Sequence, residues 1–138
     1  MPAELGELTA LTTLRLHDNR LTSLPAELGR LTALTELNLY TNELRSVPPS
    51  LGRLTALTNL SLGNNGLTSV PPELGWLTAL KKLDLGGNWI MSVPEELGGL
   101  TALTWLNLGE NHEGVDSVPA QWEEDGALKK SGCKIVRW

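Results

Sequence analysis

The sequence predicts an α/β repeat architecture, in which stacked units each contain a short strand, a turn and a short helical return. A unit of 23 residues recurs through a chain of 138 residues. Leucine dominates the apolar residues, and phenylalanine is absent. The clearest marker of the unit is an asparagine that recurs every 23 residues, at Asn19, Asn42, Asn65, Asn88 and Asn111. A period of this length indicates an array whose neighbouring units share one core.

The second unit, residues 25–47, contains the residue pattern of a strand followed by a turn. Leu37 and Leu39 alternate with polar residues, and alternation over so short a span is typical of a strand with one buried face. Asn42 follows the strand and marks the turn. Because its amide both donates and accepts hydrogen bonds, we expect it to bond the turn and the neighbouring coil. The five asparagines are therefore expected to form a structural column.

The first part of the same unit predicts the helical return. Leu28, Leu31 and Leu34 are spaced by three residues, which indicates a short helix or 3₁₀ turns with one apolar edge. Gly29 interrupts this segment and argues against a long regular helix. One unit buries too little apolar surface to offset the ordering of its own backbone, so we expect the units to stack and to form a parallel strand ladder.

The repeated segment resembles a known family. Residues 34–44 read Leu-Thr-Glu-Leu-Asn-Leu-Tyr-Thr-Asn-Glu-Leu, and the same order recurs at residues 11–21, 57–67 and 80–90, and with a variant ending at 103–111. This order resembles the L-x-x-L-x-L-x-x-N-x-L segment of leucine-rich repeats. The 23-residue period is similar to that of the subclass found in intracellular signalling scaffolds and in bacterial and protist repeat proteins. The resemblance covers about residues 2–122. It implies a right-handed solenoid with parallel strands on its concave face, a role in protein recognition, and no catalysis.

The repeats are expected to occupy residues 1–118, and residues 119–138 are expected to form a C-terminal cap. The fifth unit has two extra residues after Asn111. Val115 is expected to take the place of the missing leucine, which leaves residues 112–114 as a bulged loop.

The predicted cap begins where the repeat pattern breaks. Trp122 stands at the position that Leu97 occupies one repeat earlier. Residues 126–132 read as the end of a short helix with a C-terminal glycine, and residues 133–138 read as a last strand. We expect this segment to cover the open end of the core.

The N-terminal end has no comparable cap. The leucines at positions 5, 8, 11, 14 and 16 belong to a first coil with nothing stacked before it. Apolar ends and exposed strand edges favour association. We expect one of three situations: the chain is a fragment of a longer array, it self-associates through this end, or a partner covers it.

Composition argues against several classes of function. The net charge of −5 argues against a nucleic-acid partner, which would normally require a basic patch. No apolar run is long enough for a membrane span, and the first residues do not form a signal peptide. The single cysteine, Cys133, favours an intracellular and cytoplasmic location. No catalytic, cofactor-binding or metal-binding motif is present, so we predict none of these activities.

Comparison of the five repeats separates a constant framework from columns that vary, and we assign partner binding to the varying columns on the concave face. Tryptophan and arginine are enriched at binding hot spots. We expect Trp89 and Trp105 to flank a floor of glycines in the C-terminal half. The alternative is that Trp89 folds back onto the solenoid edge and that Trp105 caps the last strand. The candidate partner-binding residues are Arg15, His17, Glu36, Tyr40, Lys82, Asp84, Trp89, Trp105, Asn107, Glu110 and His112.

Charge and size constrain the partner. From Leu83 to Leu128 the chain has acidic residues but no lysine or arginine. This asymmetry either steers a basic partner to the C-terminal half or forms a solvated acidic face. Five short strands expose about 400 Å², whereas a specific interface buries about 800 Å² per partner. A tight partner must therefore also contact the rims or the ends, or the array must be longer.

The sequence therefore predicts a non-enzymatic protein-interaction module. One alternative is the substrate-recognition segment of a larger enzyme, such as a ligase or a kinase. The other is an engineered consensus scaffold without a native partner.

Overall fold

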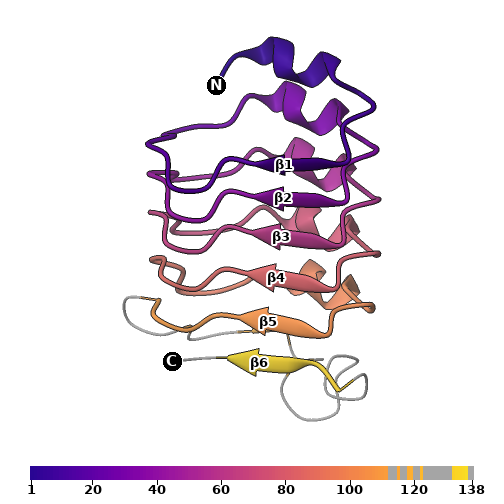
Figure 1. Ribbon diagram of the computed structural model, residues 1–138. Coiled ribbons are helices and arrows are strands. Elements are labelled where there is room, and N and C mark those ends of the chain that lie inside the picture. Colours follow the sequence, from indigo (N-terminus) through magenta and orange to yellow (C-terminus); the bar gives the residue numbers. More distant parts are fainter. Residues whose placement is uncertain (112–114, 116–117, 120–121, 123–131, 137–138) are drawn as a thin grey trace.

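The computed structural model describes residues 1–111, 115, 118–119, 122 and 132–136. Within them, six parallel strands form one sheet whose spatial order follows the sequence (Figure 1). Each strand pairs in register with its counterpart in the next coil, as Leu37 pairs with Leu60. The predicted parallel ladder and its columns are confirmed. The strands are β1 (Thr13–Arg15), β2 (Glu36–Asn38), β3 (Asn59–Ser61), β4 (Lys82–Asp84), β5 (Trp105–Asn107) and β6 (Lys134–Val136).

Each of the five return segments is a 3₁₀ helix, which is one of the two forms that the three-residue leucine spacing predicted. Pro25 precedes one of these helices in an extended conformation, with φ of −69° and ψ of 145°. The helices lie behind the sheet in Figure 1. The molecule is a right-handed solenoid with the strands on its concave face. The helices are η1 (Ala3–Glu7), η2 (Ala26–Arg30), η3 (Pro49–Arg53), η4 (Pro72–Trp76) and η5 (Glu95–Gly99).

Each of the first four 3₁₀ helices contains a glycine that allows close packing against the next coil and also disfavours a longer helix. A Cβ atom on Gly29 would lie 2.5 Å from the carbonyl oxygen of Ser50 in the next helix. Equivalent atoms on Gly6, Gly52 and Gly75 would collide in the same way with the following coil. Real Cβ atoms do not come so close, so these glycines allow neighbouring helices to stack at their observed distance.

The leucine framework forms one continuous core that opens at the N-terminal end. In the second repeat Leu31 is fully buried, whereas Leu8 at the same position of the first repeat is 54% exposed. Leu5, Leu11 and Leu14 are only partly buried, although they pack against the core. In this chain the first coil therefore presents apolar side chains to solvent, as the sequence predicted.

The asparagine column is a hydrogen-bonded ladder between coils. The Oδ1 atom of Asn65 accepts a bond from the Leu44 amide, and its Nδ2 atom donates to the carbonyls of Leu39 and Leu62. Asn42, Asn88 and Asn111 bond the coils in the same way. The predicted structural role is confirmed for these four asparagines, whereas the side chain of Asn19 bonds only carbonyls of its own coil.

The C-terminal strand is also confirmed, because β6 extends the sheet in parallel with β5. Val115 is half-buried and Trp122 is buried, and both pack against the core. Gly132 has a φ of +71°, in the left-handed region. The loop at 112–114 and the helix predicted to end at Gly132 lie outside the described residues, and the domain boundary after residue 118 stays a prediction.

Candidate partner-binding surfaces

The outward side chains of β1 to β5 form the strand face, which contains a shallow hollow of about 200 Å³. Pockets for small molecules usually measure about 300–1,000 Å³, so this hollow suits one side chain of a partner better than a free ligand. Its polar and aromatic lining comes from four neighbouring strands and comprises Glu36, Asn38, Asn59, Ser61, Lys82, Asp84 and Trp105.

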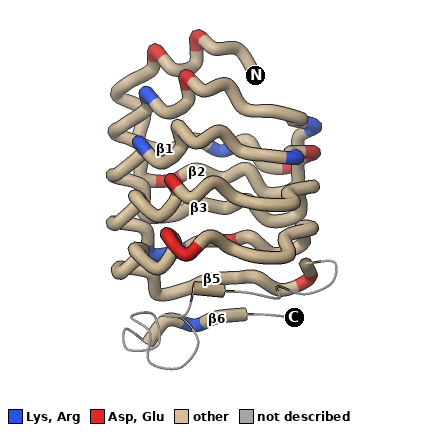
Figure 2. Tube along the Cα trace, turned by 180° about the vertical axis from the view of Figure 1, so that it is seen from behind, with Lys and Arg blue, Asp and Glu red and all other residues tan. Residues whose placement is uncertain are grey.

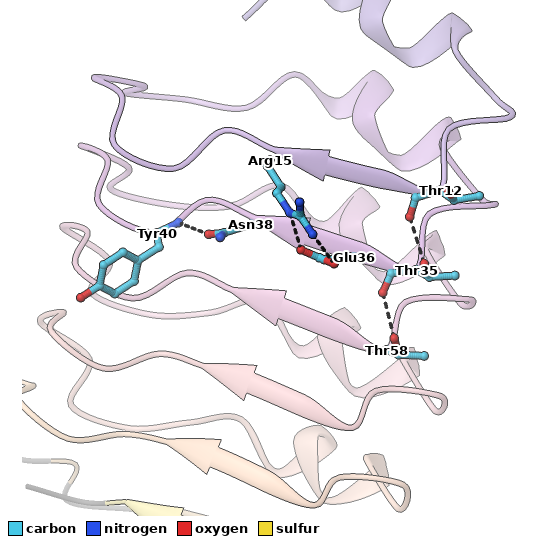
Figure 3. Close-up of polar contacts among 7 residues, drawn as sticks. All are labelled: Thr12, Arg15, Thr35, Glu36, Asn38, Tyr40 and Thr58. Carbon is cyan, nitrogen blue, oxygen red and sulfur yellow. Dashed lines mark hydrogen bonds and ion pairs between the residues drawn. The ribbon is translucent and has the colours of Figure 1, made fainter.

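Two of the predicted partner-binding residues bind each other at one side of this face. Arg15 donates two hydrogen bonds to the carboxylate of Glu36, at 2.8 Å from Nε and 3.3 Å from Nη2 (Figure 3). The hydrogen bond from Arg15 lowers the pKa of Glu36, and the same bond raises the pKa of Arg15. The pair is solvent-exposed, and each charge is already compensated by the other.

A second hollow, of about 210 Å³, lies where the strands end. Asp84 accepts hydrogen bonds of 3.0 Å through Oδ1, from the Gly86 amide and from Nδ2 of Asn107. At the opposite wall, Nδ2 of Asn64 donates a 2.8 Å bond to the hydroxyl of Tyr40. The lining residues are Tyr40, Asn64, Asp84, Gly86, Gly87, Asn107, Gly109, Glu110 and Val136.

The glycine floor predicted from the sequence supports these polar side chains. A Cβ atom on Gly86 would collide with the amide of Asn107, and one on Gly63 would lie 3.0 Å from both Asp84 and the Tyr40 ring. The absence of side chains at these positions therefore makes room for the Asp84 and Asn107 side chains and for the Tyr40 ring. Sequence comparison found the glycines but could not show what lies over them.

The structure does not bring the two predicted tryptophans to one site. Trp105 is half-buried in β5 and lines the hollow of the strand face. Trp89 follows Asn88 and lines a different hollow, together with Asn42, Glu43, Arg45, Asn65, Gly66 and Thr68. Trp89 is 52% exposed, and its hollow shares no lining residue with that of Trp105, so it belongs to a separate surface.

Among the other candidates, His17 and Glu110 are exposed at the turn that follows their strands. His17 occupies the same column as Tyr40 but lies at the open N-terminal end. His112 lies outside the described residues.

A column of threonine hydroxyls at the start of the strands was not anticipated. The hydroxyls of Thr35 and Thr58 each donate a 3.0 Å bond to the carbonyl of the threonine one repeat earlier (Figure 3). Lys81 interrupts the column, and the hydroxyl of Thr104 bonds the Lys81 carbonyl instead. The recurrence of threonine is visible in the sequence, but the bonding partner follows only from the stacking distance.

Charge is distributed unevenly along the solenoid. Figure 2 shows most of the blue lysine and arginine segments on the coils nearer the N-terminus. Within the described range 83–111 there is no basic residue, while Asp84, Glu95, Glu96 and Glu110 all carry carboxylates. The predicted charge asymmetry therefore becomes a difference between the two ends of the molecule.

The described residues contain no group of three or more histidine, cysteine, aspartate or glutamate side chains that could hold a metal ion. No helix in the described part of the chain is long and apolar enough to cross a membrane. Burial raises the pKa of the Cys133 thiol, which disfavours its reactive thiolate form.

The leucine-rich repeat family profile matches residues 9–67 and 55–112. The chain belongs to the leucine-rich repeat family. Among curated proteins, none matches the chain in sequence.

Solved structures of leucine-rich repeat proteins resemble the chain over nearly its whole length. A leucine-rich repeat protein of Leptospira interrogans is 34% identical with a TM-score of 0.85, over 98% of this chain and 33% of that chain. An internalin of Listeria monocytogenes is 28% identical with a TM-score of 0.75, over 99% of this chain and 37% of that one. The plant peptide hormone receptor RGFR1, solved in complex with RGF2, is 32% identical with a TM-score of 0.81, over 99% of this chain and 22% of that chain. This chain is therefore much shorter than the proteins it resembles.

Proposed function

We propose that the strand face of this leucine-rich repeat chain binds a protein partner. The hollow that Trp105 lines carries the proposal, because it is sized for one side chain and is bordered by residues that differ between repeats. An aromatic residue at the edge of such a hollow is a frequent hot spot. The structural similarity to a peptide hormone receptor in complex with RGF2 supports the same class of function.

The chemistry of the second hollow indicates a basic group on the partner. Asp84 and Glu110 both line it, and the described lining residues include no lysine or arginine. Oδ1 of Asp84 is engaged by two hydrogen bonds, whereas no hydrogen bond within the described residues uses Oδ2. A lysine or arginine side chain placed there could form ion pairs with both carboxylates. The acidic C-terminal half would attract it electrostatically as the partner approaches.

The test is capture of the partner from an extract of the source cells, followed by an affinity measurement on the captured protein. Trp105→Ala should weaken binding by about tenfold or more, because it removes the aromatic wall of the hollow. Trp76→Ala is the matched control, since Trp76 is 58% exposed at the end of η4, away from the strand face. Equal affinities of the two variants would contradict the proposal.

The two alternative functions, a recognition segment of a larger enzyme and an engineered scaffold, predict different results in this capture experiment. A recognition segment of a larger enzyme would bind that enzyme's substrate through the same face, and the captured protein would be modified when the longer chain is present. An engineered scaffold would capture no protein that depends on Trp105. The cytoplasmic location stays a prediction, which rests on the single cysteine.

A further inference from the structure

A second candidate surface lies on the edge where the chain turns back after each strand. We call it the turn edge, and it consists of the outward residues that follow each asparagine. The segments are held in register by backbone bonds of 2.8 Å, from the Gly66 amide to the Leu44 carbonyl and from the Trp89 amide to the Leu67 carbonyl. Inward residues such as Leu44, Leu67 and Ile90 are fully buried. The outward residues form two columns, Arg20, Glu43, Gly66 and Trp89, and Thr22, Arg45, Thr68 and Met91.

The turn edge is apolar at one end and basic at the other. Trp89 and Met91 are 52% and 56% exposed, so two large apolar side chains of the fourth repeat lie on the same surface. Clustered exposed apolar groups are more informative than scattered ones. At the other end, Arg20 and Arg45 outnumber the single carboxylate of Glu43. Between the two ends lies an open hollow of about 690 Å³.

Gly66 keeps this hollow open, although the backbone does not require glycine there. The only described glycines with positive φ are Gly87 and Gly132. A Cβ atom on Gly66 would lie 3.4 Å from the Leu44 carbonyl oxygen and 3.9 Å from Cγ of Arg45, which are ordinary contacts. The same column carries long side chains in the neighbouring repeats. The effect of Gly66 is therefore to expose Arg45 and the indole of Trp89 to a common hollow.

Arg45 is the basic group that lines this hollow, and the exposed carboxylate of Glu43 lines it as well. Within the described residues Arg15 forms a salt bridge with Glu36, whereas Arg45 makes no side-chain hydrogen bond or ion pair. Arg45 is exposed and lines the same hollow as Trp89. A carboxylate is the group that a guanidinium binds best, through two parallel hydrogen bonds.

We propose that the turn edge docks an extended acidic peptide segment of a protein partner. A large apolar side chain of the peptide packs against Trp89 and Met91, and a carboxylate binds Arg45. Trp89 and Arg45 belong to coils two repeats apart, which corresponds to about 10 Å at the usual strand spacing. An extended peptide covers this distance in about three residues. The occupant is therefore a segment with an apolar residue and an acidic residue three positions apart.

This surface is independent of the strand face in both residues and charge. The strand-face site combines Trp105 with carboxylates that favour a basic group, whereas the turn edge combines Trp89 with a guanidinium that favours an acidic one. Since the strand face alone is smaller than a typical interface, a partner of the proposed kind would gain contact area at this rim.

The direct test uses two synthetic peptides with blocked ends, made of serine except for one leucine and one aspartate three positions later. In the second peptide lysine replaces the aspartate. Binding is followed by NMR through the tryptophan indole N–H signals, which the Trp89→Ala and Trp105→Ala spectra assign. The aspartate peptide should shift the Trp89 signal and leave that of Trp105 in place. The lysine peptide should bind about fivefold more weakly, as expected for the loss of an exposed ion pair and its replacement by repulsion.

Three variants test the assignment of the contacts. Arg45→Glu should reverse the preference, so that the lysine peptide binds more tightly than the aspartate peptide. Gly66→Glu should weaken the aspartate peptide about tenfold, because its carboxylate fills the hollow beside Arg45. Gly66→Ala is the matched control and should bind like the wild type. Arg45 is exposed and Gly66 is partly exposed, and thermal melts of the three variants should verify that the fold is retained.

The outcomes separate this proposal from the function of the strand face. Failure of the aspartate peptide to shift the Trp89 signal, equal affinity for both peptides, or an unchanged preference in Arg45→Glu would each overturn the docking proposal. Trp105→Ala should leave peptide binding unchanged, and a loss there would place the peptide on the strand face instead.

Discussion

The carbonyl oxygen of Ser50 lies 2.5 Å from the position that a Cβ atom on Gly29 would occupy, so consecutive 3₁₀ helices stack only where this residue is glycine. Gly29→Ala should lower the free energy of unfolding by about 1–3 kcal/mol, because the coils must separate to admit the methyl group. Chemical denaturation measures the change. Gly66→Ala adds the same methyl group where the nearest atom is 3.4 Å away, and it should change the stability little. Equal effects of the two substitutions would contradict the stacking role.

Asparagines inside the ladder should stabilise the fold more than the asparagine at its open end. Asn65→Ala removes the acceptor of the Leu44 amide and the donor to the Leu39 and Leu62 carbonyls, all of them buried. Each unsatisfied buried group costs about 1–3 kcal/mol, so we expect a loss of about 3 kcal/mol or more. Asn19 is exposed and bonds the carbonyls of its own coil, so Asn19→Ala should cost about 1 kcal/mol or less. Urea unfolding of both variants provides the measurement, and similar losses would rule out the ladder as the cause.

Thr41 adopts a backbone conformation that is unfavourable for a β-branched residue. Its φ of 54° is left-handed, and the same column contains Asp18, Asn64 and Gly87, which tolerate that region better. Thr41→Asn should therefore raise the free energy of unfolding by about 1 kcal/mol. Thr68→Asn is the control, because Thr68 is exposed and is not among the residues with positive φ. A thermal melt should show a higher melting temperature for Thr41→Asn and an unchanged one for Thr68→Asn.

The Arg15–Glu36 pair makes stability depend on acid pH. Hydrogen bonding to Arg15 lowers the pKa of Glu36 in the folded state. The contribution of the pair is therefore complete above the pKa of an unfolded glutamate, about 4.3, and is lost as the pH falls through the lower folded value. A carboxyl NMR titration should find the pKa of Glu36 higher in Arg15→Gln than in the wild type. Identical titration curves would show that the bond does not persist in solution.

The open first coil predicts concentration-dependent association of this chain. Leu8 is 54% exposed beside other partly buried leucines, and their mutual burial would remove apolar surface from water. Sedimentation of the chain should show association at high concentration, and Leu8→Gln should reduce it. Trp76→Gln alters an equally exposed apolar residue on η4 and should not. A monomer at every concentration would exclude this end as a self-association surface.

Much of the fold follows from the repeat alone. A constant 23-residue period requires that equivalent residues pair across neighbouring coils, which is why Leu37 lies opposite Leu60. The burial of the leucines and the bonding of Asn65 follow from the same stacking. The candidate site was less predictable, because the contact between Arg15 and Glu36 depends on side-chain conformations that a comparison of columns does not contain.

The sequence by itself determined the parallel ladder, the apolar core and the set of positions that vary between repeats, since all three depend only on period and residue type. Tertiary structure alone decided which surface each varying residue occupies. A residue with left-handed φ precedes each asparagine, such as Thr41 at 54° and Gly87 at 65°. This conformation turns the chain at the end of each strand. Residues beyond the turn, Trp89 among them, therefore face the turn edge, whereas Trp105 remains on the strand face.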